Sequence, residues 1–324
     1  MTKRTPLMDR REFLGAVTAT VATLGTPSAQ TGLSQEQSPA RKPTQFQIAC
    51  MTLPYSAFPL ARALQGIKSA GYRYVAWGTS HNENGKSIPV MPADAPPQRV
   101  RELAQRCRDL GLEPVMMFSG IYPDNPKAYE VLARRVEQAA AAGIPQVLTF
   151  SSTSGGNRPA FIENLRKLGP ICRDHKVMIV VKQHGGLTAS GELCLGIIRE
   201  VGQEWIKINY DAGNVMDYLN VDPIPDLRKC AEEVRSFCIK DHRNFPKDED
   251  CGPGFGEIDH YKLLYEVAWT GRVMPLCCEN ISAPLLPRPK TPESVDDLAR
   301  RAREFLETVI AGLHSLPTPA PKKP

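Results

Sequence analysis

Short apolar runs alternate with longer segments of mixed polarity along most of the chain. The short runs are rich in β-branched and aromatic residues, which favours strands, whereas the longer segments have the length of helices. The pattern predicts eight strands, at 46–51, 73–77, 113–118, 145–150, 177–183, 205–211, 235–241 and 273–279. It also predicts eight helices, at 57–70, 97–110, 126–142, 158–174, 189–201, 222–233, 259–268 and 292–312.

The order of these segments, and the residues that connect them, indicate the fold class. Three predicted helices end at a glycine (Gly71, Gly111 and Gly143), the residue type that most often follows a helix. Strands that alternate with helices require a parallel sheet, and eight such repeats suit a closed barrel better than an open sheet. We therefore predict a single-domain α/β protein, a (β/α)8 TIM barrel over 45–312. No GxGxxG follows the first strand, so no nucleotide cofactor is expected.

The first 29 residues follow a different pattern. A basic start precedes an apolar stretch over 13–24, and small residues follow, which is the arrangement of a secretory signal peptide. The pair Arg10 and Arg11, followed by Glu-Phe-Leu, resembles the twin-arginine export signal. We therefore expect a twin-arginine-type signal peptide over 1–29, the twin-arginine export machinery as a partner, and a periplasmic or otherwise exported protein.

Two polar, proline-containing segments flank the predicted barrel. Residues 30–44 are expected to form a flexible linker, and 313–324 a disordered tail.

Composition narrows the class of protein. Of the 324 residues, 42% are hydrophobic and 23% are charged, and these ordinary values exclude wholesale disorder and collagen-like repeats. No run of about 18 apolar residues occurs, so no membrane span is expected. The net charge of +5 is small and dispersed, which gives no reason to expect a nucleic-acid partner. The nine cysteines include no CxxC and mostly lie in apolar runs, so we expect small buried hydrophobes.

Polar residues gather where the later strands end. The active site of a TIM barrel forms at the C-terminal ends of its strands. In this chain those ends carry Lys182 and His184, Asp211 with Asn214 just beyond, Cys238 with Lys240 and His242, and Glu279. Burial of so many charges in an ordinary core would be costly, so a working site explains them better. A purely structural reading stays open for Cys238, as a core residue, and for Lys240 with Asp241, as an ion pair at the rim.

The order of five motifs, KQHGG, YDAGN, CIKD, GPGFGEID and CEN, resembles the sugar phosphate isomerase/epimerase superfamily with its xylose isomerase-like TIM barrel. The resemblance covers roughly 45–312. The loop 254–259, which contains Glu257, is similar to the glycine-and-acid loop that follows strand seven in this family.

Members of the superfamily commonly hold a divalent metal with Glu, Asp, His and Glu from strands five to eight. Lys182, Asp211, Cys238 and Glu279 stand at these positions, so two of the four match. The resemblance implies one divalent metal, zinc or manganese, held by Asp211, Glu279, His184 and Cys238. The alternative is that Lys182 replaces the charge of the metal, because a charged ammonium cannot ligate a metal and repels one nearby.

The resemblance implies an exported sugar isomerase/epimerase-like enzyme that moves a proton next to a carbonyl group of a sugar or sugar derivative. Glu279 is then the leading proton-transfer residue, and Lys182 and Lys240 complete the expected catalytic set. The expected substrate contacts are His184, Trp77, His81, Asn214, His242 and Glu257. Two alternatives stay open: a non-catalytic sugar-binding barrel, and a lyase or hydrolase that acts on an oxidised glycoside. A DNA-repair endonuclease of the same barrel type is disfavoured because the chain has only six histidines.

Overall fold

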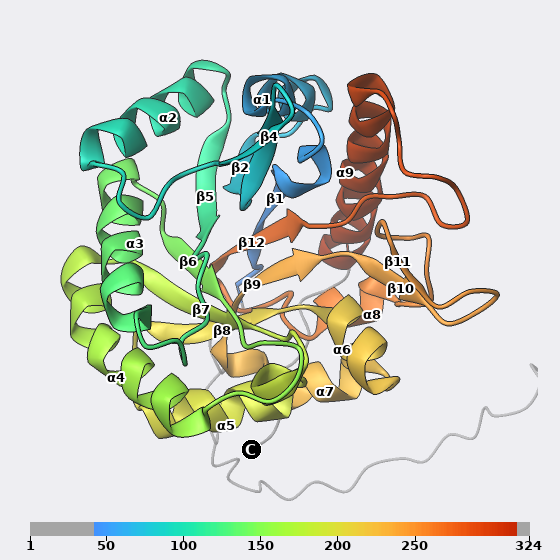
Figure 1. Ribbon diagram of the computed structural model, residues 1–324. Helices are drawn as coiled ribbons and strands as arrows, with labels where there is room; N and C mark the ends of the chain where they lie inside the picture. Colours follow the sequence, from blue (N-terminus) through green and yellow to red (C-terminus); the bar gives the residue numbers. More distant parts are fainter. Residues whose placement is uncertain (1–41, 316–324) are drawn as a thin grey trace, which may run out of the picture. The chain divides into compact units, whose positions relative to one another are not determined.

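Eight parallel strands close into a barrel in the computed structural model, which describes residues 42–315 (Figure 1). The order around the barrel is β1-β12-β9-β8-β7-β6-β5-β2. The strands are β1 (Gln45–Met51), β2 (Tyr74–Trp77), β5 (Glu113–Phe118), β6 (Gln146–Thr149), β7 (Met178–Lys182), β8 (Ile206–Tyr210), β9 (Val234–Ile239) and β12 (Val273–Cys278). The prediction of a single-domain (β/α)8 TIM barrel is confirmed, and each predicted strand matches an observed one to within two residues.

Helices connect the strands and pack around the outside of the barrel (Figure 1). They are α1 (Leu60–Ser69), α2 (Pro97–Asp109), α3 (Ala128–Ala142), α4 (Arg158–His175), α5 (Gly191–Val201), α6 (Ala212–Leu219), α7 (Pro223–Cys230), α8 (His260–Tyr265) and α9 (Pro292–His314). Three short 3₁₀ turns lie at Leu53–Tyr55, Gly186–Thr188 and Ala231–Glu233. Among the described residues, no helix has both the length and the apolar character needed to cross a membrane. The predicted signal peptide lies outside the described residues.

Alternation along the strands divides the core into two layers. Alternate residues point into the barrel, where they form one buried cluster; its members include Ala49, Met51, Ala76, Met116, Phe118, Leu148, Val180, Cys238 and Cys277. The remaining strand residues, such as Val75, Trp77 and Phe237, pack against the helices. All nine cysteines are buried and free, as their apolar surroundings predicted.

Two hairpins and one helix were not predicted. Strands β3 (Ser80–Glu83) and β4 (Lys86–Pro89) pair around Asn84 and Gly85, both with positive φ, and this Asn-Gly pair is a recognised hairpin signal. Strands β10 (Asp241–Arg243) and β11 (Glu249–Cys251) form the second hairpin. Helix α6 is short and contains Gly213 and Asn214, so its sequence resembled a loop.

The last helix also extends beyond its predicted end at residue 312. Leu313 is fully buried, and the ring of His314 stacks on Phe46 at 6.1 Å between centroids. These contacts hold the first residues of the predicted tail in the helix.

Candidate functional site

The C-terminal ends of β7, β9 and β12 open onto a cavity of about 440 Å³. Its lining includes Lys182, His184, Asn214, Lys240 and Glu279, together with Phe58 and Tyr218. The structure thus brings together five of the residues expected in the site. Their common direction follows from the strand phase: Val180, Cys238 and Cys277 point into the barrel, so Lys182, Lys240 and Glu279, two residues further on, point the same way.

Lys182 is the centre of the site. Its Nζ donates to Oε1 and Oε2 of Glu279 at 2.7 and 2.9 Å, and it lies 3.1 Å from Oδ2 of Asp211 as an ion pair. The ammonium group also lies 5.3 Å from the centre of the Phe150 ring, a cation–π contact. The side chains of Lys182 and Asp211 are 3% and 0% exposed, so two carboxylates and one ammonium share a nearly dry space.

Asp211 is fixed by the start of α6. Its Oδ1 accepts a hydrogen bond from the backbone N–H of Asn214 at 3.0 Å, which makes it the N-cap of the helix. Its own N–H donates to Oε1 of Gln183 at 2.7 Å, and Nδ2 of Asn214 donates to the backbone oxygen of Gln183 at 2.6 Å. With Oδ1 held in this way, Oδ2 faces Lys182.

Burial and the neighbouring charges shift the pKa values of Asp211, Glu279 and Lys182 in opposite directions. Burial raises the pKa of Asp211 to about 6, against the opposing effect of Lys240 and Lys182. Burial also acts to raise the pKa of Glu279, but Lys182 and Lys240 outweigh it and lower that pKa to about 2. For Lys182, burial acts to lower the pKa, but Glu279 and Asp211 raise it well above its usual value. Lys182 therefore remains an ammonium ion and Glu279 a carboxylate at neutral pH.

His184 carries the group best suited to accept a proton. Its Nδ1 lies 2.9 Å from the backbone oxygen of Ser151, so Nδ1 carries the hydrogen and Nε2 keeps its lone pair. Burial lowers the pKa of His184 below 6.5, so the imidazole is neutral at pH 7. The ring packs between Phe150 and Tyr218, with centroids 4.4 and 5.9 Å away, and this contact holds it at the cavity wall.

Lys240 and His242 are linked through Asp250 of β11. Nζ of Lys240 donates to Oδ2 of Asp250 at 2.7 Å, and Nδ1 of His242 lies 3.1 Å from Oδ1 of the same carboxylate. Burial acts to lower the pKa of Lys240, but Asp211 and Glu279 raise it overall. His242 was expected to contact substrate, but it does not line the cavity; it lies behind Asp250.

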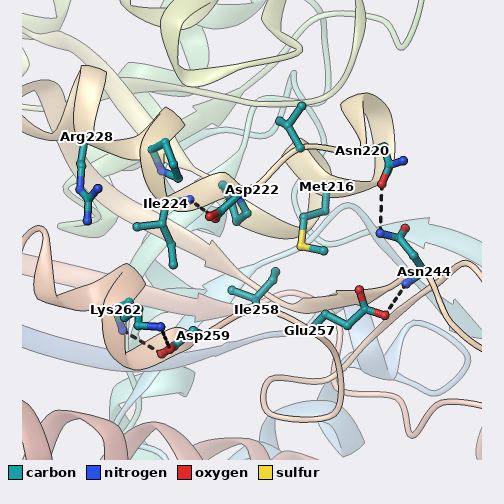
Figure 2. A pocket seen from close by; sticks show the side chains of 13 residues that line it. Met216, Asn220, Asp222, Ile224, Arg228, Asn244, Glu257, Ile258, Asp259 and Lys262 are labelled. Carbon is teal, nitrogen blue, oxygen red and sulfur yellow. Dashed lines mark hydrogen bonds and ion pairs between the residues drawn. The ribbon is translucent and has the colours of Figure 1, made fainter.

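Three more residues expected at the site lie elsewhere. Trp77 points outward to the helices because its neighbour Ala76 takes the inward phase of β2. His81 is buried in β3, where its Nδ1 lies 2.9 Å from the backbone oxygen of Phe58. Glu257 lines a separate cavity of about 490 Å³, where it accepts a hydrogen bond from the backbone N–H of Asn244 (Figure 2). It also accepts one from the backbone N–H of Phe245.

Sequence reasoning missed several contributors to the site, among them Phe58 and Tyr218 of the cavity lining. Phe150 is the last residue of the fourth predicted strand. It lies two residues after Leu148, so the alternation of a strand places both side chains on the inner face of the barrel. Asp250 and Asp217 carried no such signal, because the hairpin and helix that present them were not predicted.

A family model described as xylose isomerase-like TIM barrel matches residues 64–309. The chain belongs to this family. No curated protein matches the chain significantly. The xylose isomerase-like fold recurs in solved structures. An L-ribulose 3-epimerase is 17% identical with a TM-score of 0.63, over 83% of this chain and 95% of that one. A xylose isomerase-like TIM barrel protein from Mycobacterium smegmatis, in complex with magnesium, is 15% identical with a TM-score of 0.63, over 84% and 97%.

A fusion of a xylose isomerase-like TIM barrel with a 4-hydroxyphenylpyruvate dioxygenase is 19% identical, with a TM-score of 0.63. The match covers 84% of this chain, but only 44% of the fusion protein. At these identities the likeness concerns the fold.

The metal quartet expected from the xylose isomerase-like family does not fit a divalent cation here. Ligand atoms of Asp211, Cys238 and Glu279 lie within 4.8 Å of one another, which is close enough for a metal. However, the ammonium of Lys182 contacts both carboxylates and stays charged. Burial raises the pKa of Cys238 well above its usual value, so in the absence of a metal its side chain is a thiol. His184 is not part of this group of ligands. A cation here would have to displace Lys182.

Proposed function

We propose that the chain is an enzyme that moves a proton at a carbon next to the carbonyl group of a sugar or sugar derivative, with Lys182 in place of a metal ion. The observation that carries the proposal is the ammonium of Lys182, held by Glu279 and Asp211 at the floor of a cavity with a neutral imidazole on its wall. The family membership, and the epimerase among structures of similar fold, support the same class of chemistry.

The reaction needs a base and a positive charge. Nε2 of His184 removes the proton from the carbon, and the C–H electron pair moves toward the carbonyl oxygen, which gives an enediolate. The ammonium groups of Lys182 and Lys240 stabilise the negative charge on that oxygen. His184 returns the proton to the neighbouring carbon, and the hydroxyl proton of the first carbon moves to the former carbonyl oxygen, which gives an isomer. An epimer forms instead when a water molecule on the opposite face of the first carbon supplies the proton and His184 releases its own proton to solvent.

Glu279 has a different role in this scheme from that expected of it. A carboxylate with a pKa of about 2 is ionised but is a weak base, whereas general bases work best with a pKa near the working pH. We assign Glu279 to hold the ammonium of Lys182 in place, together with Asp211. His184, whose imidazole is neutral at pH 7 and whose Nε2 keeps its lone pair, is the group that accepts the proton.

Hydrogen exchange tests this proposal. The purified protein is incubated in D₂O with a panel of aldoses, ketoses and their oxidised derivatives, and NMR follows the signal of each proton next to a carbonyl. Proton transfer replaces that signal by deuterium, and His184→Gln slows the replacement by about 10²–10⁴-fold. Binding of a sugar without exchange would favour the non-catalytic barrel. Loss of water or cleavage of a glycoside would favour the lyase or hydrolase.

We also propose that the protein is exported, on the basis of residues 1–29. The twin-arginine machinery would then be its partner and the periplasm its site of action. Fractionation of cells that express the full chain tests this second proposal.

A further inference from the structure

A second cluster of possible metal ligands lies beside the cavity, formed by side chains that have no part in the proposed proton transfer. Ligand atoms of Asp217 on α6 and of His242 and Asp248 on the β10–β11 hairpin lie within 4.8 Å of one another. Nε2 of His242 is 3.3 Å from Oδ1 of Asp248. Two ligands about 2.1 Å from a tetrahedral ion lie about 3.4 Å apart, so this spacing suits one ion between them.

The histidine is oriented as metal-binding histidines are. His242 is 1% exposed, and its Nδ1 faces Oδ1 of Asp250 at 3.1 Å. A carboxylate that accepts the Nδ1–H of a histidine fixes the ring and leaves Nε2 as a lone-pair donor for a metal. Nε2 of His242 then faces Asp248 and Asn244, which both present acceptor oxygens, so a neutral ring finds no donor there.

A fourth possible ligand atom, an amide oxygen, is held toward the same point. Nδ2 of Asn244 donates to Oδ1 of Asn220 at 3.1 Å, as Figure 2 shows. This bond fixes which way the amide points, so Oδ1 of Asn244 faces Nε2 of His242 at 3.3 Å. An imidazole nitrogen, two carboxylates and an amide oxygen therefore converge.

The charge of the cluster also favours a cation. Asp217, Asp248 and Asp250 bring three carboxylates, and within residues 42–315 the ammonium of Lys240 forms an ion pair with Asp250. A divalent cation between Asp217 and Asp248 would offset the repulsion between these two carboxylates.

We propose that His242, Asp217 and Asp248, with Asn244, form a binding site for one divalent transition-metal ion at the wall of the cavity. Mixed nitrogen and oxygen ligands without a thiolate suit zinc or manganese. Asp217 lines the cavity, so an ion there would have an open side toward a bound molecule. This site is separate from the group of Asp211, Cys238 and Glu279, whose carboxylates pair with Lys182. The proposal does not depend on the proposed reaction.

Cobalt(II) tests the proposal because its spectrum reports its ligands. Metal-free protein is titrated with Co²⁺, with calorimetry for Zn²⁺ alongside. We expect about one ion per chain, with weak visible bands and no thiolate-to-cobalt charge-transfer band. Asp217→Asn and Asp248→Asn should each weaken binding by at least about 10-fold. The matched control is Asp297→Asn, which removes a carboxylate with 73% exposure against 74% for Asp248 and should leave binding unchanged.

Three outcomes would each contradict the proposed metal site. The first is the absence of saturable binding of Co²⁺ or Zn²⁺ to the metal-free protein. The second is equal affinity in Asp217→Asn, Asp248→Asn and the control. The third is a thiolate band that disappears in Cys238→Ser, which would place the ion among Asp211, Cys238 and Glu279 instead. Circular dichroism of each variant checks that the barrel is intact.

Discussion

Replacement of Lys182 by methionine is the sharpest test of the ammonium-centred site. The change keeps the length of the side chain and removes its charge, so Asp211 and Glu279 are left facing each other without the ammonium between them. Removal of one member of a buried ion pair costs about 3–5 kcal/mol. The lowering of the pKa of Glu279 from 4.5 to about 2 corresponds to about 3 kcal/mol, and Lys240 supplies part of it. We therefore expect Lys182→Met to lose about 3 kcal/mol of unfolding free energy at pH 7.5.

The loss of unfolding free energy in Lys182→Met should vary with pH in a characteristic way. In the native chain the pKa of Glu279 is lowered by folding, so its contribution is present above about pH 4.5 and is lost as the pH falls toward 2. Without Lys182, the folded-state pKa values of Asp211 and Glu279 both rise. A carboxyl with a raised pKa in the folded state destabilises the protein as the pH rises through that pKa, which for Asp211 already lies at about 6. The variant should therefore be less destabilised at pH 5 than at pH 8.

Urea unfolding followed by circular dichroism at pH 5, 6.5 and 8 measures both effects. Lys207→Met on β8 is the matched control, because Lys207 pairs with Glu233 at 2.5 Å, in a more exposed setting of 14% and 32%. Such a pair contributes about 0–1 kcal/mol and little dependence on pH in this range. A loss in Lys182→Met no larger than in Lys207→Met, or one that is equal at pH 5 and pH 8, would refute the reasoning.

Three further predictions concern the base, the metal quartet and export. The rate of deuterium exchange in the native protein should fall on acidification with an apparent pKa below 6.5, because His184 must be neutral to accept a proton; a pH-independent rate between 5 and 8 would contradict that role. Lys182→Met should create cobalt binding with a thiolate charge-transfer band, since Asp211, Cys238 and Glu279 are then free to share an ion; the double variant Lys182→Met, Cys238→Ser should lack the band. The double variant Arg10→Lys, Arg11→Lys should remain in the cytoplasm on fractionation, and unchanged export would remove the twin-arginine assignment.

Local pattern was enough to predict the barrel, because each barrel strand is a short apolar run and several of the helices between them end at a glycine. The same pattern placed Lys182, Lys240 and Glu279 at one end of the barrel, since strand phase carries over from their buried neighbours. The pattern could not predict contacts between residues that lie far apart in the sequence. The pairing of Lys182 with Glu279 joins two strands that are not adjacent in the barrel, and only closure brings them within 2.7 Å.

Two errors had signals that were available. Trp77 was assigned to the cavity, although Ala76 and Trp77 cannot share a face of one strand and the tryptophan is the residue that packs outward. The hairpin around Asn84 and Gly85 was also legible as a turn. By contrast, the position of His242 behind Asp250 depends on the register of β10 with β11, which the polar sequence of that hairpin does not specify.

The nine buried thiols can report how fast and how often each part of the barrel opens. They are spread over the sheet and the surrounding helices, and a reagent in solution can reach each one only when its own part of the fold separates. The rate at which a disulfide reagent modifies Cys107 on α2, compared with Cys277 in the barrel interior, would therefore rank the local opening free energies of the outer and inner layers. No probe needs to be engineered into the chain for that measurement.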